Sequence, residues 1–350
     1  MKTIASLGAS ATFTAAAADT SPPTAQPAAD TVPRRPLGKT GAQVSVLGVG
    51  GHHLGDFKRV DDAVDMIRYA LDVGINFFDN CWEYYNGLTE TIVGRALKGQ
   101  RDRAFVMTKV CTHGRGAEIA MQMLEESLRR LQTDHLDLWQ IHAISYDNDP
   151  DLVYAKGGVL EAFERAKKQG KVRFVGFSGH KDPVFHLRML ELGYAFDTVQ
   201  MPLNPFDYNY HSFEKMVLPE VTRRGMSALG MKSMGGTAAA VTKGLVEAKD
   251  LLRYAMSLPV ATTISGMESI DVLQRNLAVA RNFQPMTAAE MDALRARCAE
   301  AAADGRYELY KGTLKFDNPV TRMPHGFPID KAQKEVKAMF EKANGSWRIG

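Results

Sequence analysis

Short apolar runs alternate with amphipathic segments along most of the chain. Eight apolar runs read as buried strands, at residues 44–50, 76–80, 104–110, 136–142, 172–179, 197–203, 226–232 and 262–267. After each run, apolar residues recur at three- and four-residue steps, as on helices with one buried face. These helical segments are 61–74, 89–99, 117–132, 158–170, 183–193, 212–225, 245–259 and 269–281. The pattern predicts eight strands and eight helices in strict alternation.

The repeating unit is about the size of a βαβ motif, roughly 30 residues. Right-handed crossovers then leave two main architectures, an open doubly wound sheet or a closed eight-stranded barrel. Eight equal units without a break favour the barrel. The dinucleotide fingerprint of the open sheet is absent, because His53 stands where "GVGGHHLG" (48–55) needs its third glycine. The predicted fold class is therefore α/β, a (β/α)8 TIM barrel.

The two ends of the chain depart from this alternation. Residues 34–45 read as a small hairpin with its turn at 39–41, placed to cap the lower end of the barrel. A further helix is predicted from Thr287 to about residue 305, and a charged helix around 331–342. We therefore divide the chain into a leader (1–33), a barrel (34–285) and a C-terminal helix with a tail (286–350).

The leader is rich in Ala, Ser, Thr and Pro and carries almost no charge before Arg34. One lysine, a weakly apolar stretch and a run of small residues resemble a signal peptide followed by a linker. A disordered leader without an address explains the same composition. The predicted location is therefore the cytoplasm, or the periplasm if the leader is a genuine export signal.

Composition narrows the classes of partner. The 350 residues carry a net charge of only +3, without a basic stripe, so nucleic acid is not an expected partner. No run of 18 apolar residues follows the leader, so no membrane span is expected. Cys81, Cys111 and Cys298 form no C-x-x-C, so we expect neither a metal site nor an iron–sulfur cluster. Nothing in the composition indicates an oligomeric state.

Polar residues gather at the carboxyl ends of neighbouring strands, where barrels carry their chemistry. The second predicted strand ends in Asp79 with Tyr84 in the following loop, the third carries Lys109 and the fourth ends in His142. Lys109 is the natural partner of the Asp79 carboxylate. Its charge is expected to lower the pKa of Tyr84, which would make the phenol a proton donor to a carbonyl oxygen that His142 orients.

This arrangement delivers a proton and lacks a hydride donor, which points to a nicotinamide cofactor. The motifs "RPLGKTGAQVSVLGVG" (35–50), "FFDNCWEYYNG" (77–87), "MTKV" (107–110) and "LDLWQIH" (136–142) resemble those of the aldo-keto reductases. The resemblance extends from about Arg35 to Arg281. It implies reversible NAD(P)H-dependent reduction of aldehydes and ketones, with Tyr84 as general acid, Lys109 and Asp79 tuning it, and His142 orienting the carbonyl.

The same resemblance implies which residues bind the cofactor: Ser178, Gln200, Met231, Lys232, Ser233, Gly266, Glu268 and Asn276. The chain departs from the family at Gly179, which replaces an asparagine, and at Met231, which replaces a stacking tyrosine. Glu268 would repel a 2′-phosphate, while Arg275 compensates, so NADP(H) and NAD(H) both remain open.

The expected substrate is a small carbonyl compound, in a pocket walled by Trp82, Tyr85 and Cys111. His52 and His53 are adjacent in a predicted strand end, so only one of them is expected to line the site. Two other functions remain possible. One is a Schiff-base lyase that uses Lys109 or Lys232 as its amine, and the other is a cofactor-binding regulatory or sensor barrel without turnover.

Overall fold

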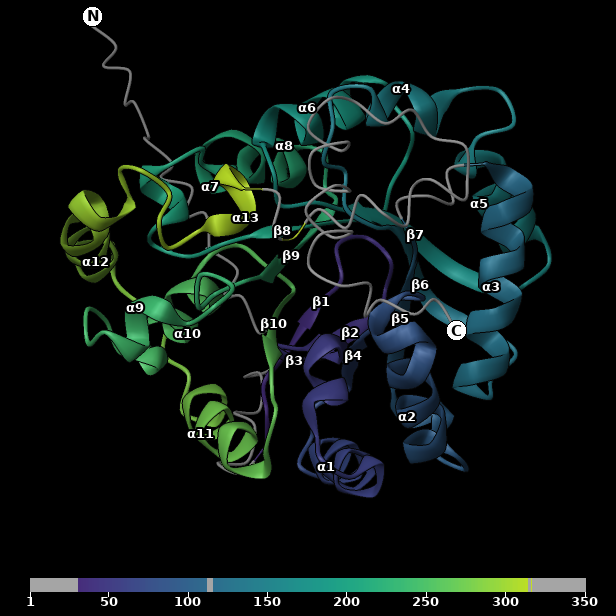
Figure 1. Ribbon diagram of the computed structural model, residues 1–350, viewed down its shortest axis with the longest axis horizontal. Helices are drawn as coiled ribbons and strands as arrows, with labels where there is room; N and C mark the ends of the chain where they lie inside the picture. The colour runs from purple at the N-terminus through teal and green to yellow at the C-terminus, as the bar shows by residue number, and fades with distance from the viewer. Residues whose placement is uncertain (1–30, 112–115, 314–315, 317–350) are drawn as a thin grey trace, which may run out of the picture.

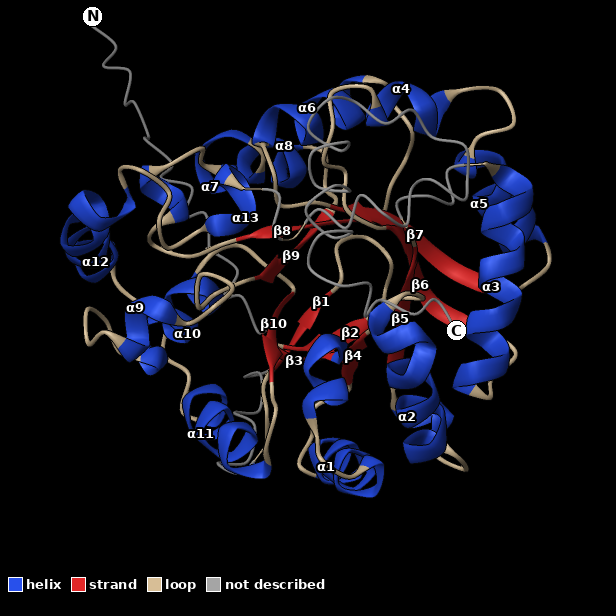
Figure 2. Cartoon of the chain, in the orientation of Figure 1, coloured by secondary structure: helices blue, strands red, loops and turns tan. Residues whose placement is uncertain are grey.

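The computed structural model describes residues 31–111, 116–313 and 316, and it contains a closed barrel of eight parallel strands (Figures 1 and 2). Each strand pairs with the next along the chain, and the last pairs with the first. The strands are β3 (Leu47–Gly50), β4 (Phe77–Asp79), β5 (Phe105–Val110), β6 (Leu136–Ile141), β7 (Val172–Ser178), β8 (Thr198–Pro202), β9 (Ser227–Met231) and β10 (Thr262–Gly266). The predicted TIM barrel is confirmed.

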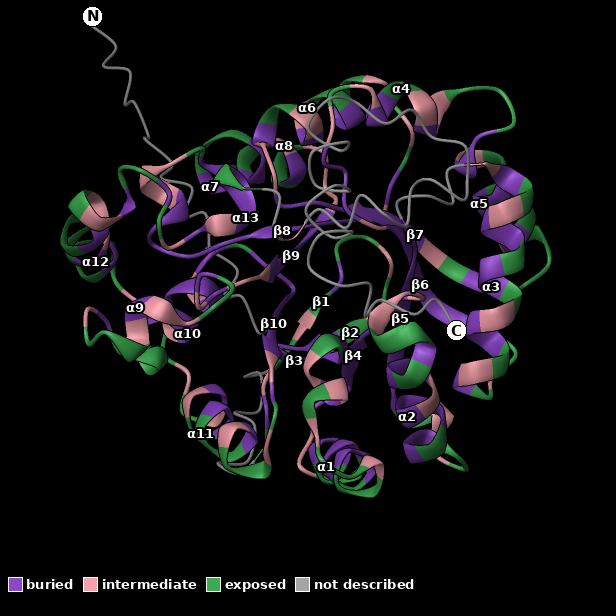
Figure 3. Ribbon diagram, in the orientation of Figure 1, coloured by how far each residue is buried: buried purple, intermediate pink, exposed green. Residues whose placement is uncertain are grey.

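Amphipathic helices surround the barrel and cover its outer face (Figure 3). Those predicted between strands are α1 (Val60–Asp72), α2 (Leu88–Leu97), α3 (Ala117–Leu131), α5 (Val159–Lys168), α6 (Pro183–Glu191), α10 (Ala248–Ser257) and α11 (Ile270–Arg281). The pattern missed short elements, which are α4 (Asp149–Tyr154), α9 (Ala239–Thr242), α13 (Leu309–Gly312) and the 3₁₀ helices η1 (Gly51–Asp56), η2 (Tyr84–Gly87), η3 (Arg101–Arg103) and η4 (Asp207–Asn209). No helix in the described ranges is long and apolar enough to cross a bilayer.

One predicted helix, 212–225, is divided in the structure. It forms α7 (Phe213–Met216) and α8 (Leu218–Arg223). Pro219 lies in the first turn of α8, where a missing N–H is tolerated, whereas inside a longer helix it would break the hydrogen-bond ladder. Beyond the barrel, α12 (Ala288–Ala302) begins at Thr287 as predicted, with a capping box to Glu290. The leader up to residue 30 and the helix expected around 331–342 lie outside the described residues.

A hairpin closes the amino-terminal end of the barrel. The predicted strand 44–50 contributes to two sheets, because β2 (Gln43–Ser45) pairs antiparallel with β1 (Arg34–Pro36) and only β3 joins the barrel. Leu37 and Val44 of the hairpin pack with residues from the starts of the strands, Phe77 and Phe105 among them, in a small apolar cluster. The hairpin therefore plugs one end of the barrel, and the carboxyl ends of the strands remain for the site.

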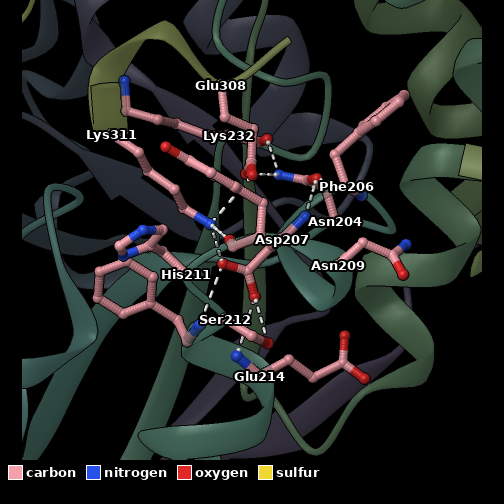
Figure 4. Close-up of polar contacts among 12 residues, drawn as sticks. Asn204, Phe206, Asp207, Asn209, His211, Ser212, Glu214, Lys232, Glu308 and Lys311 are labelled. Atoms are coloured by element: carbon pink, nitrogen blue, oxygen red, sulfur yellow. Dashed lines mark hydrogen bonds and ion pairs between the residues drawn. The ribbon is translucent and has the colours of Figure 1, made fainter. Parts of the chain in front are cut away.

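A buried cluster of charges attaches α13 to the loop that follows β8 (Figure 4). Lys311 Nζ donates to Asp207 Oδ1 at 2.5 Å and to Glu308 Oε2 at 3.0 Å, and all three side chains are buried. Asn204 Nδ2 donates to Glu308 Oε1 at 3.0 Å. Burial raises the pKa of Asp207 and of Glu308, so Lys311 is the charge that makes both carboxylates tolerable. We call Asn204, Asp207, Glu308 and Lys311 the Asp207–Lys311 cluster.

Replacing Lys311→Met should lower the free energy of unfolding by about 3–5 kcal/mol, since it leaves two buried carboxylates without their cation. Urea unfolding followed by circular dichroism measures this loss. The double variant Asp207→Asn/Lys311→Met should recover part of it, because one uncompensated charge is then removed.

Arg223→Met is the matched control, because Arg223 pairs with Glu220 on α8 and its side chain is 69% exposed. Exposed pairs contribute about 0–1 kcal/mol, so this variant should unfold almost as the wild type does. Equal losses in Lys311→Met and Arg223→Met would contradict the stabilising role of the Asp207–Lys311 cluster.

Candidate active site

A cavity of about 1280 Å³ opens at the carboxyl ends of the strands, opposite the hairpin. It is lined by strand ends on both sides of the β10–β3 seam, including Gly50, Asp79, Gln200, Met231 and Ser265. One end of the cavity reaches Tyr84 in η2, and the lining continues along β10 to Asn276 on α11. A cavity of this size at this edge of a barrel is the default position for a ligand.

Asp79 and Lys109 form a buried ion pair beside the cavity. They lie on the neighbouring strands β4 and β5, with exposed fractions of 5% and 1%. Lys109 Nζ also donates to the carbonyl oxygen of Asn80 at 2.8 Å. The predicted pairing is present, and the second hydrogen bond helps to offset the loss of hydration that two buried charges suffer.

Tyr84 lies beside this pair, with Lys109 Nζ 5.3 Å from the centroid of its ring. Burial, followed by the negative charge of Asp79, raises the pKa of Tyr84 well above 10.0. The predicted lowering of this pKa by Lys109 is therefore wrong for the protein alone, because burial and the Asp79 charge outweigh the effect of the ammonium. The phenol stays protonated at neutral pH and can donate its proton.

The backbone after Tyr84 is held in an unusual turn. Tyr85, Asn86 and Gly87 all have positive φ, at 48°, 53° and 84°, which reverses the chain into α2. Gly87 has a φ of 84°, which favours glycine, and a Cβ there would also have to displace the Arg130 guanidinium, 2.3 Å away. This local geometry fixes the position from which Tyr84 enters the cavity.

His142 directly follows β6, and its Nδ1 is already engaged. Nδ1 lies 2.8 Å from Glu83 Oε1 and 3.2 Å from Cys81 Sγ, while the imidazole and Tyr84 rings meet edge-on with centroids 5.7 Å apart. The contact with Glu83 leaves Nε2 as the nitrogen available to a ligand.

Cys81, Glu83 and His142 also bring three possible metal-ligand atoms within 4.8 Å of one another. The sequence pattern predicted no cluster of metal ligands, and Glu83 was not among the predicted site residues. The cluster joins residues about 60 positions apart, and the only local signal was an acid placed directly before Tyr84. An acid–imidazole hydrogen bond accounts for the same geometry without an ion.

The predicted cofactor residues gather along one side of the cavity. Seven of the eight line it, namely Gln200, Met231, Lys232, Ser233, Gly266, Glu268 and Asn276. Ser178 is buried, and its hydroxyl donates to the carbonyl oxygen of Ile141 at 3.3 Å. Gln200 Oε1 is buried without a partner among the described residues, and Gln200 Nε2 contacts Met231 Sδ at 3.6 Å. An unpaired amide oxygen fits the carboxamide of a nicotinamide ring.

Packing explains the departure at Gly179. A Cβ there would lie 2.6 Å from the Ile144 carbonyl oxygen and 2.5 Å from the His186 ring. The asparagine side chain implied by the resemblance therefore has no room, and the role of Gln200 as a carboxamide partner stays a prediction.

The three predicted substrate-pocket residues do not line this cavity. Trp82 Nε1 donates to Glu126 on α3 at 2.8 Å, Tyr85 is exposed and bonded to Asp56, and Cys111 Sγ donates to Glu83 Oε2 at 2.9 Å. Their assignment to a substrate pocket stays a prediction.

His52 and His53, in contrast, both line the cavity. They lie in the 3₁₀ helix η1 and not in a strand, so alternation does not separate their side chains. The expectation that only one of them would do so was wrong.

Comparison with known proteins identifies relatives of this chain. The sequence model described as the aldo/keto reductase family matches residues 46–250. L-galactose dehydrogenase of Arabidopsis thaliana is 37% identical over 155 residues, 41% of this chain and 48% of that protein. Aldo-keto reductase YhdN of Bacillus subtilis is 31% identical over 201 residues, 52% of this chain and 56% of that protein. The chain spans about half the length of these curated relatives.

Solved structures resemble the fold over more of its length. The holo form of an aldo-keto reductase from Bacillus halodurans has a TM-score of 0.66 and 25% identity, over 79% of this chain and 99% of that one. An aldo-keto reductase from Klebsiella pneumoniae in complex with NADP and acetate has a TM-score of 0.61 and 23% identity, over 77% and 95%. The second likeness concerns the fold alone.

The raised pKa of Tyr84 can be tested by titration. The difference in phenolate absorbance between the wild type and Tyr84→Phe should stay flat through pH 10, since burial and Asp79 oppose ionisation. In guanidinium-denatured protein the same difference should appear near pH 10, because the ordinary pKa of a tyrosine is about 10. An inflection below pH 10 in the native protein would restore the original expectation of a phenol acidified by Lys109.

Proposed function

This chain belongs to the aldo/keto reductase family, and from that premise we propose that it reduces aldehydes or ketones to alcohols with a nicotinamide cofactor. The observation that carries the proposal is a protonated phenol, Tyr84, beside the buried Asp79–Lys109 pair at one end of a large cavity. The unpaired oxygen of Gln200 on the same cavity wall supports a carboxamide-bearing ligand.

The residues divide the work of proton delivery. A bound nicotinamide would supply the hydride to the carbonyl carbon. Tyr84 would donate its phenolic proton to the carbonyl oxygen, which would leave an alcohol and a phenolate. The Lys109 ammonium, 5.3 Å from the ring centroid, stabilises the phenolate, and Asp79 holds Lys109 in place. His142 keeps Nε2 for the carbonyl oxygen because Glu83 engages Nδ1.

The protonation state of Tyr84 determines whether it can assist reduction of the carbonyl or oxidation of the alcohol. Reduction needs the protonated phenol, which the raised pKa of Tyr84 maintains at neutral pH. Oxidation of the alcohol needs the phenolate and is expected to accelerate as the pH rises. No step requires a metal or an iron–sulfur cluster, so we propose that turnover survives chelators unchanged.

The cofactor is NADP(H) or NAD(H), and the residues that we propose to hold it are Gln200, Met231, Ser233, Gly266, Glu268 and Asn276. Glu268 and Arg275 both line the cavity and act in opposite senses on a 2′-phosphate. The substrates are small carbonyl compounds, and neither nucleic acid nor a membrane span enters the proposal. We propose that the protein is located in the cytoplasm, or in the periplasm if the leader is a genuine export signal.

The two other functions receive less support. The Lys109 amine is ion-paired and therefore a poor nucleophile for a Schiff-base lyase, while Lys232 remains the amine to test by borohydride trapping of a carbonyl ligand. A sensor without turnover would not need Asp79, Tyr84 and Lys109 arranged for proton transfer.

Tyr84→Phe should lower kcat for carbonyl reduction by about 10²- to 10⁴-fold, the range for loss of a general acid, with little change in cofactor affinity. The assay follows loss of NADPH or NADH absorbance with a panel of aldehydes, ketones and quinones. Tyr208→Phe, on η4 outside the cavity lining, is the matched control and should turn over as the wild type does. Cofactor binding by the wild type without reduction of any carbonyl would favour the sensor.

Glu268→Gln should raise the ratio of kcat/KM with NADPH to kcat/KM with NADH by roughly threefold to tenfold, because it removes a charge that repels the 2′-phosphate. Arg275→Gln should lower the same ratio. Glu300→Gln, an exposed change of equal charge on α12, serves as the control. A fall in the ratio for Glu268→Gln would mean that Glu268 does not face the adenosine end.

A further inference from the structure

Lys232 brings a second ammonium group to the cavity. It directly follows β9 and has a left-handed backbone, with φ of 54°. A non-glycine residue in this region is strained by about 1–2 kcal/mol, and Asn204 of the Asp207–Lys311 cluster holds it there by donating to the Lys232 carbonyl oxygen at 3.1 Å. Figure 4 shows Lys232 beside Asn204 and Glu308.

Within the described residues no carboxylate is ion-paired to Lys232 Nζ. Asp79 is paired with Lys109, and Asp207 and Glu308 are paired with Lys311. The ammonium instead lies 5.0 Å from the centroid of the Tyr310 ring and 4.8 Å from that of Phe316. Two aromatic faces stabilise a cation only partly, and they leave it without a counter-charge.

Burial and the charge of Lys109 lower the pKa of Lys232 to about 8. The group therefore still carries its charge on most molecules at neutral pH. The effect of Lys109 also places the two ammonium groups within electrostatic reach of each other, at the catalytic end of the cavity.

A second unsatisfied group accompanies Lys232. His180 follows β7 and is 6% exposed. Its Nδ1 has no hydrogen-bond partner among the residues that the structure describes, and its ring meets that of Tyr310 edge-on with centroids 5.7 Å apart. Burial lowers the pKa of His180 well below 6.5, so the imidazole is neutral and keeps one N–H to donate. Tyr310 thus lies beside both Lys232, which has no ion-pair partner among the described residues, and His180, whose Nδ1 has no hydrogen-bond partner among them.

We propose that Lys232, assisted by His180, binds a carboxylate on the substrate, so that the preferred substrates are aldehydes or ketones that carry a carboxylate. This inference rests on the proposed reductase function and names the class of carbonyl compound. The rings of Tyr310 and Phe316 face Lys232 Nζ and are the apolar groups next to the proposed carboxylate site.

The pyrophosphate of the cofactor is the other oxyanion that Lys232 can meet. A pyrophosphate takes several hydrogen-bond donors, as at a helix N-terminus or a glycine-rich loop, whereas aromatic rings offer it none. Ser233, Gly235 and Gly236 provide such a loop immediately after Lys232. The cofactor therefore has a better-suited anion site in this wall, and we assign Lys232 to the substrate.

The test compares 4-carboxybenzaldehyde with its methyl ester, which differ in the negative charge and little in shape. The wild type should have a kcat/KM at least about tenfold higher for the acid. Lys232→Met should lower the value for the acid by about 10- to 100-fold, mainly through KM, and leave the ester within about threefold, as for one lost charge-assisted hydrogen bond. Lys232→Arg should retain the preference for the acid.

Lys243→Met is the matched control, because Lys243 Nζ also lies over a tyrosine ring, Tyr307 at 5.5 Å, outside the cavity lining. It should leave both substrates unaffected. Fluorescence titration of NADPH and NADH should give the same Kd for the wild type and Lys232→Met.

Weaker cofactor binding with equal losses on acid and ester would overturn the inference and assign Lys232 to the pyrophosphate. Reduction of the ester by a wild type that shows no preference for the acid would overturn it and leave the reductase function standing. A wild type that reduces neither aldehyde nor any other carbonyl would remove the proposed function and the inference together.

Discussion

The site depends on one buried ion pair. Lys109 and Asp79 lose their hydration on adjacent strands, and the parallel register of β4 and β5 brings them together. The pair also affects its neighbour, because burial and the Asp79 charge together raise the pKa of Tyr84 and outweigh the opposing effect of the Lys109 ammonium. The phenol therefore rests as a neutral acid, and in the proposed reaction the ammonium offsets part of the cost of forming the phenolate.

Local pattern predicted the barrel and the strand ends, since periodicity is a property of neighbouring residues. The pairing of Asp79 with Lys109 followed from adjacent strands. The direction of the pKa shift of Tyr84 did not, because desolvation depends on the tertiary packing around a side chain. Glu83 and His142 are far apart in the sequence, so local sequence patterns could not predict their contact.

Much of what distinguishes this barrel comes from outside the repeating units. Tyr310 belongs to α13, beyond the last strand–helix unit, and it lies beside Lys232 where Lys311 and Asn204 hold α13 to the loop after β8. One short helix therefore carries both a stabilising cluster and part of the proposed binding site. Substitutions in the Asp207–Lys311 cluster should act on ligand choice as well as on unfolding.

The turn after Tyr84 has a consequence for the entropy of the reaction. Tyr85 and Asn86 adopt positive φ values that are unfavourable for residues with a Cβ, and Gly87 continues the turn beside Arg130, so the turn is set when the protein folds. The loss of freedom that orders the acid is thus incurred once per folded molecule and not once per turnover. In the proposed reaction, ordering of this loop then adds little to the activation entropy of proton transfer, because the turn that carries Tyr84 is already in place.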